Sequence, residues 1–278
     1  MSARDFLTNV SVIIAVMAIG ALIETAVPMF LADAWKHGRR SANLWLTATS
    51  FFSNWVLASV AAIAALSARP AGLMARLQWP LWLQIVTGIV VLDFSVGYLS
   101  HRLMHMWPAM WRFHQVHHSD DFVDVTTTYR THPVETVWRF LFAIVPVWAL
   151  GVPAPAVVIQ RLLQATNGVI EHANIRLWPP LDRVLSLLWV TPNVHKIHHS
   201  REMSETNSNY ANLLTIYDRV LGTYTPAERA RSVVYGLDDA GSLATGSYPT
   251  LLALPFRAVD RTGELPDTKV RIEATAGR

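Results

Sequence analysis

The chain has 278 residues, of which 52% are hydrophobic and 15% charged. Soluble domains carry about 25% charged residues, so this composition indicates a membrane protein. It also excludes intrinsic disorder, coiled coils and collagen. Lysine and arginine exceed aspartate and glutamate by only three, without a long basic run, so we expect no nucleic-acid partner. The absence of cysteine excludes disulfides, iron–sulfur clusters and cysteine nucleophiles.

Three apolar segments in the first part of the chain predict membrane helices. Residues 6–31 are long enough to span a bilayer, with Glu24 as the one charge inside. A cleaved signal peptide is the alternative, because residues 32–34 resemble a cleavage site, but the apolar stretch is longer than such peptides have. Residues 43–67 form the second predicted span, and a third helix is predicted over about 80–106.

Two further apolar segments, residues 136–150 and 155–172, predict a helical hairpin that is broken at residues 151–153. Each arm is short for a full membrane crossing, so we expect the hairpin to be tilted or partly re-entrant. From residue 225 on the sequence is polar, with glycine, proline and mixed charge. This composition predicts a soluble cytoplasmic cap or tail.

The distribution of lysine and arginine predicts the orientation in the membrane. Loop 32–42 carries three of these residues, connection 68–76 carries two and the N-terminal tail carries one. The positive-inside rule places loop 32–42 in the cytoplasm, so the third helix ends there too. We therefore expect an integral protein of a bacterial inner membrane or an equivalent membrane, with its active site on the cytoplasmic side.

Eight of the eleven histidines fall in three short motifs near the ends of predicted helices. The motifs are His101-Arg-Leu-Met-His105, His114-Gln-Val-His117-His118 and His195-Lys-Ile-His198-His199. Positions i, i+3 and i+4 share one helix face, so each motif directs several imidazoles at one point. Imidazole is a ligand for Fe, Zn, Cu and Ni, and eight histidines exceed the need of one ion. We predict two transition-metal ions, each held by four or five nitrogens.

Other polar residues are predicted close to these motifs. His172 ends the hairpin on the same membrane side and is a ninth candidate ligand, with a structural role as the alternative. Glu135 and Glu171 are expected to accept imidazole N–H bonds, and His132 to orient a ligand. Asp93, two helical turns before His101, is an intramembrane carboxylate; we expect it to bond a ligand or line a substrate tunnel, with helix packing as the alternative.

Five segments resemble the sterol desaturase/fatty acid hydroxylase superfamily of integral-membrane di-iron enzymes. They are HRLMH (101–105), HQVHHS (114–119), YRTHPVE (129–135), EHANI (171–175) and TPNVHKIHHSREMSETNSNYANLLTIYDRVLGTY (191–224). The resemblance covers roughly residues 80–225. One departure is Tyr217-Asp218-Arg219-Val220-Leu221-Gly222-Thr223, where the family often has Trp-Asp-Arg-x-Phe-Gly-Thr; the replacements are apolar and touch no ligand.

The resemblance implies a specific site and chemistry. It implies these metal ligands: His101, His105, His114, His117, His118, His172, His195, His198 and His199. It also implies that Asn209 helps to hold the last segment beside the metals. The cofactor would be two iron ions, and O₂ would be the co-substrate. The enzyme would be an oxidoreductase that hydroxylates or desaturates an unactivated C–H position of a lipid, such as a sterol or a fatty acyl chain.

Electrons for such a reaction must come from another protein, because the chain has no cysteine and no glycine motif for a flavin or nicotinamide. We expect a ferredoxin, rubredoxin or cytochrome b5-like donor, with its reductase, on the cytoplasmic face. An acidic donor would be attracted by basic residues near the motifs, namely Arg102, Arg112, Lys196 and Arg201. The lipid substrate would enter from the bilayer, past tryptophan and phenylalanine side chains of 43–67 and 136–150.

The predicted fold is an all-α integral-membrane bundle with about four membrane-embedded helical elements and a cytoplasmic helical cap that carries the di-metal site. We expect N-terminal transmembrane helices over 1–77, a catalytic domain over 78–225 and a cytoplasmic tail over 226–278. Two alternatives use the same histidines, a zinc-dependent membrane hydrolase and a non-enzymatic metal transporter or sensor. Hydrolysis needs an open water position, and transport sites lie near the midplane between repeats, which this chain lacks.

Overall fold

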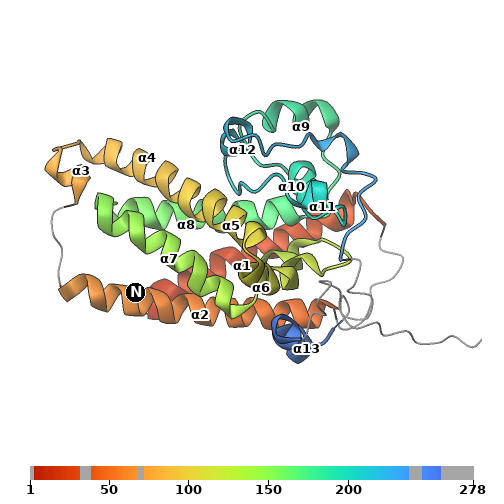
Figure 1. Ribbon diagram of the computed structural model, residues 1–278, viewed down its shortest axis with the longest axis horizontal. Coiled ribbons are helices and arrows are strands. Elements are labelled where there is room, and N and C mark those ends of the chain that lie inside the picture. Colours follow the sequence, from red (N-terminus) through yellow and green to blue (C-terminus); the bar gives the residue numbers. More distant parts are fainter. Residues whose placement is uncertain (1–2, 32–38, 68–71, 238–245, 258–278) are drawn as a thin grey trace, which may run out of the picture.

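The computed structural model describes residues 3–31, 39–67, 72–237 and 246–257. Within these ranges the chain is helical, and its only β-structure consists of isolated bridges. Figure 1 shows the long helices lying beside one another, with the short helices α9 to α12 gathered at one end. The predicted all-α fold is therefore confirmed.

Long helices form the bundle, and short ones follow them. The long elements are α1 (Ala3–Ala26), α2 (Arg39–Ser67), α4 (Leu81–Leu92) with the π-helical η1 (Asp93–Leu99) and α5 (Ser100–Met106), α7 (Pro133–Leu150) and α8 (Ala154–His172). The short ones are α3 (Leu73–Arg76), α6 (Pro108–His118), η2 (Val125–Tyr129), α9 (Pro179–Leu185), α10 (Pro192–His198), α11 (Met203–Thr206), α12 (Ile216–Val220), η3 (Ala227–Arg229), α13 (Tyr248–Ala253) and η5 (Leu254–Phe256).

Three helices are long and apolar enough to cross a membrane, over Phe6–Ala26, Leu81–Met106 and Pro133–Leu150. They support a membrane protein. The predicted span 43–67 is helical within α2 but is not among these three, so its crossing of the membrane stays a prediction. The expectation that both hairpin arms are short does not hold for α7, which meets the same length and composition criteria.

The first and third predicted helices differ in how they end. The first helix stops at Ala26 instead of continuing to residue 31, because a residue before proline disfavours helical backbone and Pro28 pairs instead with Ile175. The third helix runs unbroken to Met106, as predicted, through one π-helical stretch. The hairpin turns at Gly151, whose φ of 72° is in the left-handed region that glycine favours.

Buried polar bonds join α2 to the chain that follows α6. The guanidinium of Arg39 lies 2.9 Å from a carboxylate oxygen of Asp120 and also pairs with Asp124. Arg130 donates to Asn43 Oδ1 and to Ser119 Oγ, both at 2.8 Å. Since Ser119 and Asp120 directly follow His118, α2 fixes the end of the second histidine motif.

The last turn of α1 is joined to the same end of the bundle. Glu24 accepts hydrogen bonds from the backbone N–H of Val125 at 2.9 Å and of Asn174 at 2.7 Å. Asn174 lies two residues beyond His172. The N-terminal helix therefore anchors the segment that carries the ninth candidate ligand.

Part of the predicted C-terminal tail is packed against the bundle. Leu251 and Leu254 form a buried cluster with Ala42 and Leu46 of α2 and Val116 of α6. Residues 238–245 and 258–278 lie outside the described residues, as do loop 32–38, with Lys36 and His37, and Arg69. The domain boundaries and the membrane orientation therefore stay predictions.

Candidate metal centre

All nine histidines predicted as ligands lie together at one end of the bundle. Four short stretches supply them: α5 carries two, α6 three, the last residue of α8 one, and α10 with its C-terminal neighbour three. Their ring nitrogens form two groups. The five-histidine group contains His101, His105, His114, His118 and His198, and the four-histidine group contains His117, His172, His195 and His199.

Ring nitrogens within each group converge on one point. In the four-histidine group, Nε2 of His172 lies 3.1 Å from Nε2 of His117, of His195 and of His199. In the five-histidine group, Nε2 of His101 lies 3.0 Å from that of His114 and 3.1 Å from that of His198. Nitrogens that share one ion at roughly 2.0–2.1 Å each lie about this far apart.

Hydrogen bonds cannot explain this convergence. Nδ1 of His172 lies 2.6 Å from the carbonyl oxygen of Gly168 and donates to it, so Nε2 of the neutral ring carries only a lone pair. That lone pair faces three other ring nitrogens. A cation at the centre satisfies all four nitrogens, so the donor set fits a metal ion.

Buried ring nitrogens without a partner support the same conclusion. Both nitrogens of His118 and Nε2 of His105 are buried and form no hydrogen bond. Each such group costs about 1–3 kcal/mol when left unsatisfied. Burial also lowers the pKa of His198 to about 4 and holds the pKa of His199 well below its usual value. The rings are therefore neutral at pH 7, the state in which imidazole binds a metal.

Several rings are held by a hydrogen bond from Nδ1, which leaves Nε2 free to face the centre. His101 donates to the carbonyl oxygen of Tyr210 at 2.7 Å, and His198 donates to that of Ser208 at 2.7 Å. His114 donates to Glu135 Oε2 at 2.8 Å. Such outer contacts fix the tautomer and the orientation of metal-ligating histidines.

A cavity of about 420 Å³ reaches this centre from the bundle interior, lined by residues of α1, α2, α7 and α8. His101, His117, His172 and His195 line one end of it. Phe51 and Trp55 of α2 and Phe140 of α7 are in its wall, in the two segments from which aromatic lining was predicted. The cavity therefore connects the bundle interior with four of the nine histidines.

Comparison with known proteins identifies the family to which this chain belongs. Residues 85–223 match the family model described as fatty acid hydroxylase. This chain belongs to the fatty acid hydroxylase family. The resemblance predicted from the histidine motifs is thereby confirmed. No solved structure matches the chain.

Several relatives are similar to this chain over part of their length. The ornithine lipid hydroxylase OlsE of Rhizobium tropici is 36% identical over 180 residues, which are 64% of this chain and 52% of that protein. The alkylglycerol monooxygenase of Homo sapiens is 31% identical over 56% of this chain and 33% of its own length. The fatty acid hydroxylase vlmA of Lecanicillium sp is 26% identical over 56% of this chain and 46% of its own length. The chain thus spans about half of these relatives or less.

Two of the other predicted residues lie next to a candidate ligand. Glu135 bonds His114, as expected for a carboxylate that orients an imidazole. Its second oxygen accepts from the backbone N–H of His132 at 3.2 Å. The ring of His132 packs against Phe113 and Phe256 instead of facing the centre, so His132 contributes through Glu135.

Glu171 and Asn209 lie beside the last histidine motif. Glu171 Oε1 is 3.9 Å from Nε2 of His195 and accepts a hydrogen bond from Asn212 at 2.7 Å. Asn209 donates to the carbonyl oxygen of Val194 at 3.1 Å and to that of Thr225 at 2.8 Å. Asn209 therefore bonds the residue that precedes His195, and its role in holding the last segment beside metal ions stays a prediction.

Asp93 occupies the helix-packing position that was its predicted alternative, whereas Lys196 is not at the surface where it was predicted. Asp93 is buried next to Gly97, where an added Cβ would come within 2.8 Å of the Asp93 carboxylate. Asp93 is not bonded to a ligand histidine and does not line the cavity.

Lys196 is fully buried and donates to the carbonyl oxygen of Ala173 at 2.6 Å. Burial lowers the pKa of Lys196 to about 7. The expectation that Lys196 attracts an acidic partner at the surface is therefore wrong.

The backbone carbonyl groups that orient three of the ligands were not found from the sequence. They belong to Gly168, Ser208 and Tyr210, and every residue type has such a group, so no pattern marks them. The buried pair Arg39–Asp120 was missed for a related reason, since its partners are 81 residues apart.

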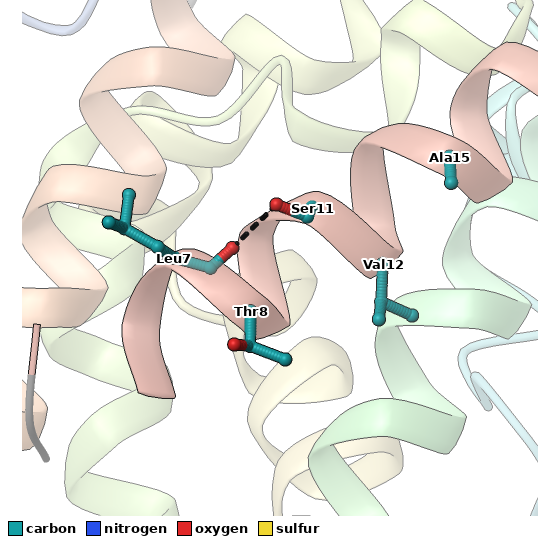
Figure 2. A pocket seen from close by; sticks show the side chains of 5 residues that line it. All are labelled: Leu7, Thr8, Ser11, Val12 and Ala15. Carbon is teal, nitrogen blue, oxygen red and sulfur yellow. Dashed lines mark hydrogen bonds between the residues drawn. The ribbon is translucent and has the colours of Figure 1, made fainter. Parts of the chain in front are cut away.

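A shallow groove elsewhere on the surface is unrelated to the centre. It lies on the outer side of α1 and is lined by Leu7, Thr8, Ser11, Val12 and Ala15 (Figure 2). Its one bond among these residues is within the helix, from the Ser11 hydroxyl to the carbonyl oxygen of Leu7 at 2.8 Å. An outward, mostly apolar helix face of this kind is expected of a membrane helix.

Proposed function

We propose that this chain is a membrane-bound di-iron oxygenase that uses O₂ and electrons from a partner protein to hydroxylate an unactivated C–H position of a lipid. The observation that carries the proposal is the convergence of nine imidazoles into groups of five and four. The relatives named hydroxylase and monooxygenase favour hydroxylation over desaturation.

Two iron ions, when bound, would supply O₂ activation, with the balance RH + O₂ + 2 e⁻ + 2 H⁺ → ROH + H₂O. The chain's own residues supply the setting. His101, His114, His172 and His198 are orientated by their Nδ1–H bonds. Because these bonds are made by the chain's own groups, the ligands are preorganised for the reaction.

The cavity supplies the path for a lipid. Its wall is predominantly apolar and includes Phe51, Trp55 and Phe140, and its inner end is formed by the histidines. An apolar chain in this cavity excludes water from the reacting carbon, which prevents side reactions. We infer that the substrate is a lipid that enters from the bilayer, consistent with the ornithine lipid after which one relative is called.

The electron donor would approach from the side of the five-histidine group. Of the nine histidines, His105 alone is half-buried, and all others are buried. The half-buried indole of Trp111 packs on it, with ring centroids 5.0 Å apart. Arg102 is half-buried and Arg112 exposed on the same two short helices, α5 and α6. We infer that an acidic ferredoxin, rubredoxin or cytochrome b5-like protein docks there, on the cytoplasmic side.

Metal content tests this proposal. The full chain, purified in detergent and reconstituted anaerobically with Fe(II), should hold about two irons per chain. His117→Ala should hold clearly less iron and lose hydroxylation, whereas the control His37→Ala, outside the three motifs, should match the parent. An unchanged iron content in His117→Ala would contradict the site. Turnover that persists without O₂ would favour the zinc-dependent hydrolase instead.

A further inference from the structure

The cavity has a charged residue at the end away from the histidines. Arg161 lines the cavity on the face of α8 that also carries Gln164, Gly168 and His172. These positions are three to four residues apart, so they share one helix face. Arg161 is exposed at this end, whereas His172 is buried at the other. One helix face thus connects a guanidinium to the metal centre.

The guanidinium is held in place by a neutral neighbour. Arg161 Nη2 donates to Asn54 Oδ1 at 3.0 Å. Asn54 Nδ2 donates in turn to the carbonyl oxygen of Ser50 at 2.9 Å, which fixes the amide oxygen toward Arg161. A guanidinium has five N–H donors, so this bond leaves most of them available to a ligand in the cavity.

Arg161 forms no ion pair with a carboxylate in the part of the chain that the structure describes. It is eight residues into α8, which returns along the candidate membrane span α7 after the turn at Gly151. Ala143 of α7 and Ile13 of α1 line the same cavity, so Arg161 lies beside two candidate membrane spans. A charged side chain among apolar membrane helices is costly unless a partner compensates it.

We propose that Arg161, positioned by Asn54, binds the anionic oxygen group of the lipid substrate. A guanidinium pairs with a carboxylate or a phosphate through two parallel N–H···O bonds. The substrate class is therefore an acidic amphiphile, and a carboxylate is the group that the single guanidinium matches in charge. This proposal rests on the proposed function, because it assigns the far end of the same cavity.

The separation along α8 sets which carbon reacts. Eleven residues separate Arg161 from His172, and a rise of about 1.5 Å per residue gives roughly 16 Å along the axis. The oxidised carbon is therefore far along the chain from the anionic group, not adjacent to it. Phe51, Trp55 and Phe140 line the same cavity and are apolar contacts for the hydrocarbon.

Binding measured without turnover tests the proposal. Tritiated palmitate and its methyl ester are bound to the iron-loaded full chain in detergent, for the parent, Arg161→Met, Arg161→Lys and the control Arg183→Met on the exposed face of α9. Arg161→Met should weaken palmitate binding by about tenfold or more and leave the methyl ester nearly unchanged. Arg161→Lys should fall between, because it keeps the charge and loses the planar fork.

The outcomes separate this proposal from the proposed function. Unchanged binding of both palmitate and dodecyl phosphate in Arg161→Met, or an equal loss for acid and ester, overturns it. Binding of dodecyl phosphate is measured in the same way. If Arg161→Met weakens binding of the phosphate and not of palmitate, Arg161 still binds an anionic oxygen group, and that group is a phosphate. Iron content is measured on each variant, and Arg161→Met should retain the parent value. A chain that binds palmitate through Arg161 but holds no iron contradicts the proposed function alone.

Discussion

The two histidine groups differ in how their rings are held. In the five-histidine group, four of the five rings have an Nδ1 contact. His101 contacts Tyr210 and His105 contacts Asn207. His114 contacts Glu135 and His198 contacts Ser208. In the four-histidine group only His172 has one, and the other three Nδ1 atoms are buried without a partner. The first group is rigidly orientated and reaches the surface, whereas the second is buried and faces the cavity.

This difference indicates that the two histidine groups have different roles in the reaction. The five-histidine group, with half-buried His105, lies on the side from which we propose that electrons arrive. Three of the four rings of the other group line the cavity from which we propose that the lipid arrives. Outer contacts raise ligand basicity and metal affinity. The five-histidine site should therefore bind its ion more tightly.

The largest expected effect comes from removing one ligand of each group. His118→Ala and His195→Ala should each lower the iron content from about two to about one and abolish hydroxylation, since both sites are needed. The measurement is iron per chain after anaerobic reconstitution. If either variant lost both ions or kept both, the two groups would not be separate sites.

Breaking the buried anchor beside the five-histidine group should strongly reduce stability. Arg39→Met leaves Asp120 buried without its charged partner, and breaking a buried pair costs about 3–5 kcal/mol. The neighbouring Arg40→Met is the control: its side chain is 40% exposed and its pair with Asp124 spans 3.7 Å, so about 0–1 kcal/mol is expected. Denaturant unfolding in detergent measures both, and equal losses would refute the structural role of Arg39.

Removing the Nδ1 contact of His114 should weaken only the five-histidine site. Glu135→Leu deletes the acceptor, and losing such a contact typically lowers metal affinity 10–100-fold. Glu135→Gln keeps an acceptor oxygen and should lose less. The control is Glu228→Gln, an exposed residue. Equilibrium titration with Fe(II) shows which of the two binding steps is weakened. Weakening of the second step alone would mean that the five-histidine group is not the tighter site.

The smallest effect expected is a difference in affinity between the two sites of the parent chain. Titration with Zn(II), which tolerates air, should give two steps. The tighter step should be missing in His198→Ala and the weaker one in His195→Ala. The reverse order would show that outer contacts do not set the affinity here.

The spacing of eight histidines and the place of His172 at the end of the hairpin were enough to predict nine ligands near one another, but not their division. In α6, His114 and His118 belong to one group while His117 belongs to the other. Positions i, i+3 and i+4 share a helix face, so spacing alone predicts a common direction. When two centres lie side by side, that one face serves both, and only the packing of α5, α6, α8 and α10 assigns each ring.

Burial was harder to predict for polar residues than for apolar ones. Lys196 follows His195 and faces away from the centre, which for an isolated helix means solvent. In the fold that opposite face packs against the end of α8, where the Ala173 carbonyl accepts its ammonium proton. The helical fold, by contrast, follows from apolar runs, and the hairpin turn follows from Gly151.

Locating the iron atoms tests directly whether the five-histidine and four-histidine groups are two separate metal sites. Anomalous diffraction at the iron edge, from crystals of the Fe(II)-loaded chain, places each ion without reference to activity. Two peaks are expected, one among His101, His105, His114, His118 and His198 and one among His117, His172, His195 and His199. A single peak, or peaks away from these rings, would contradict the division into five and four.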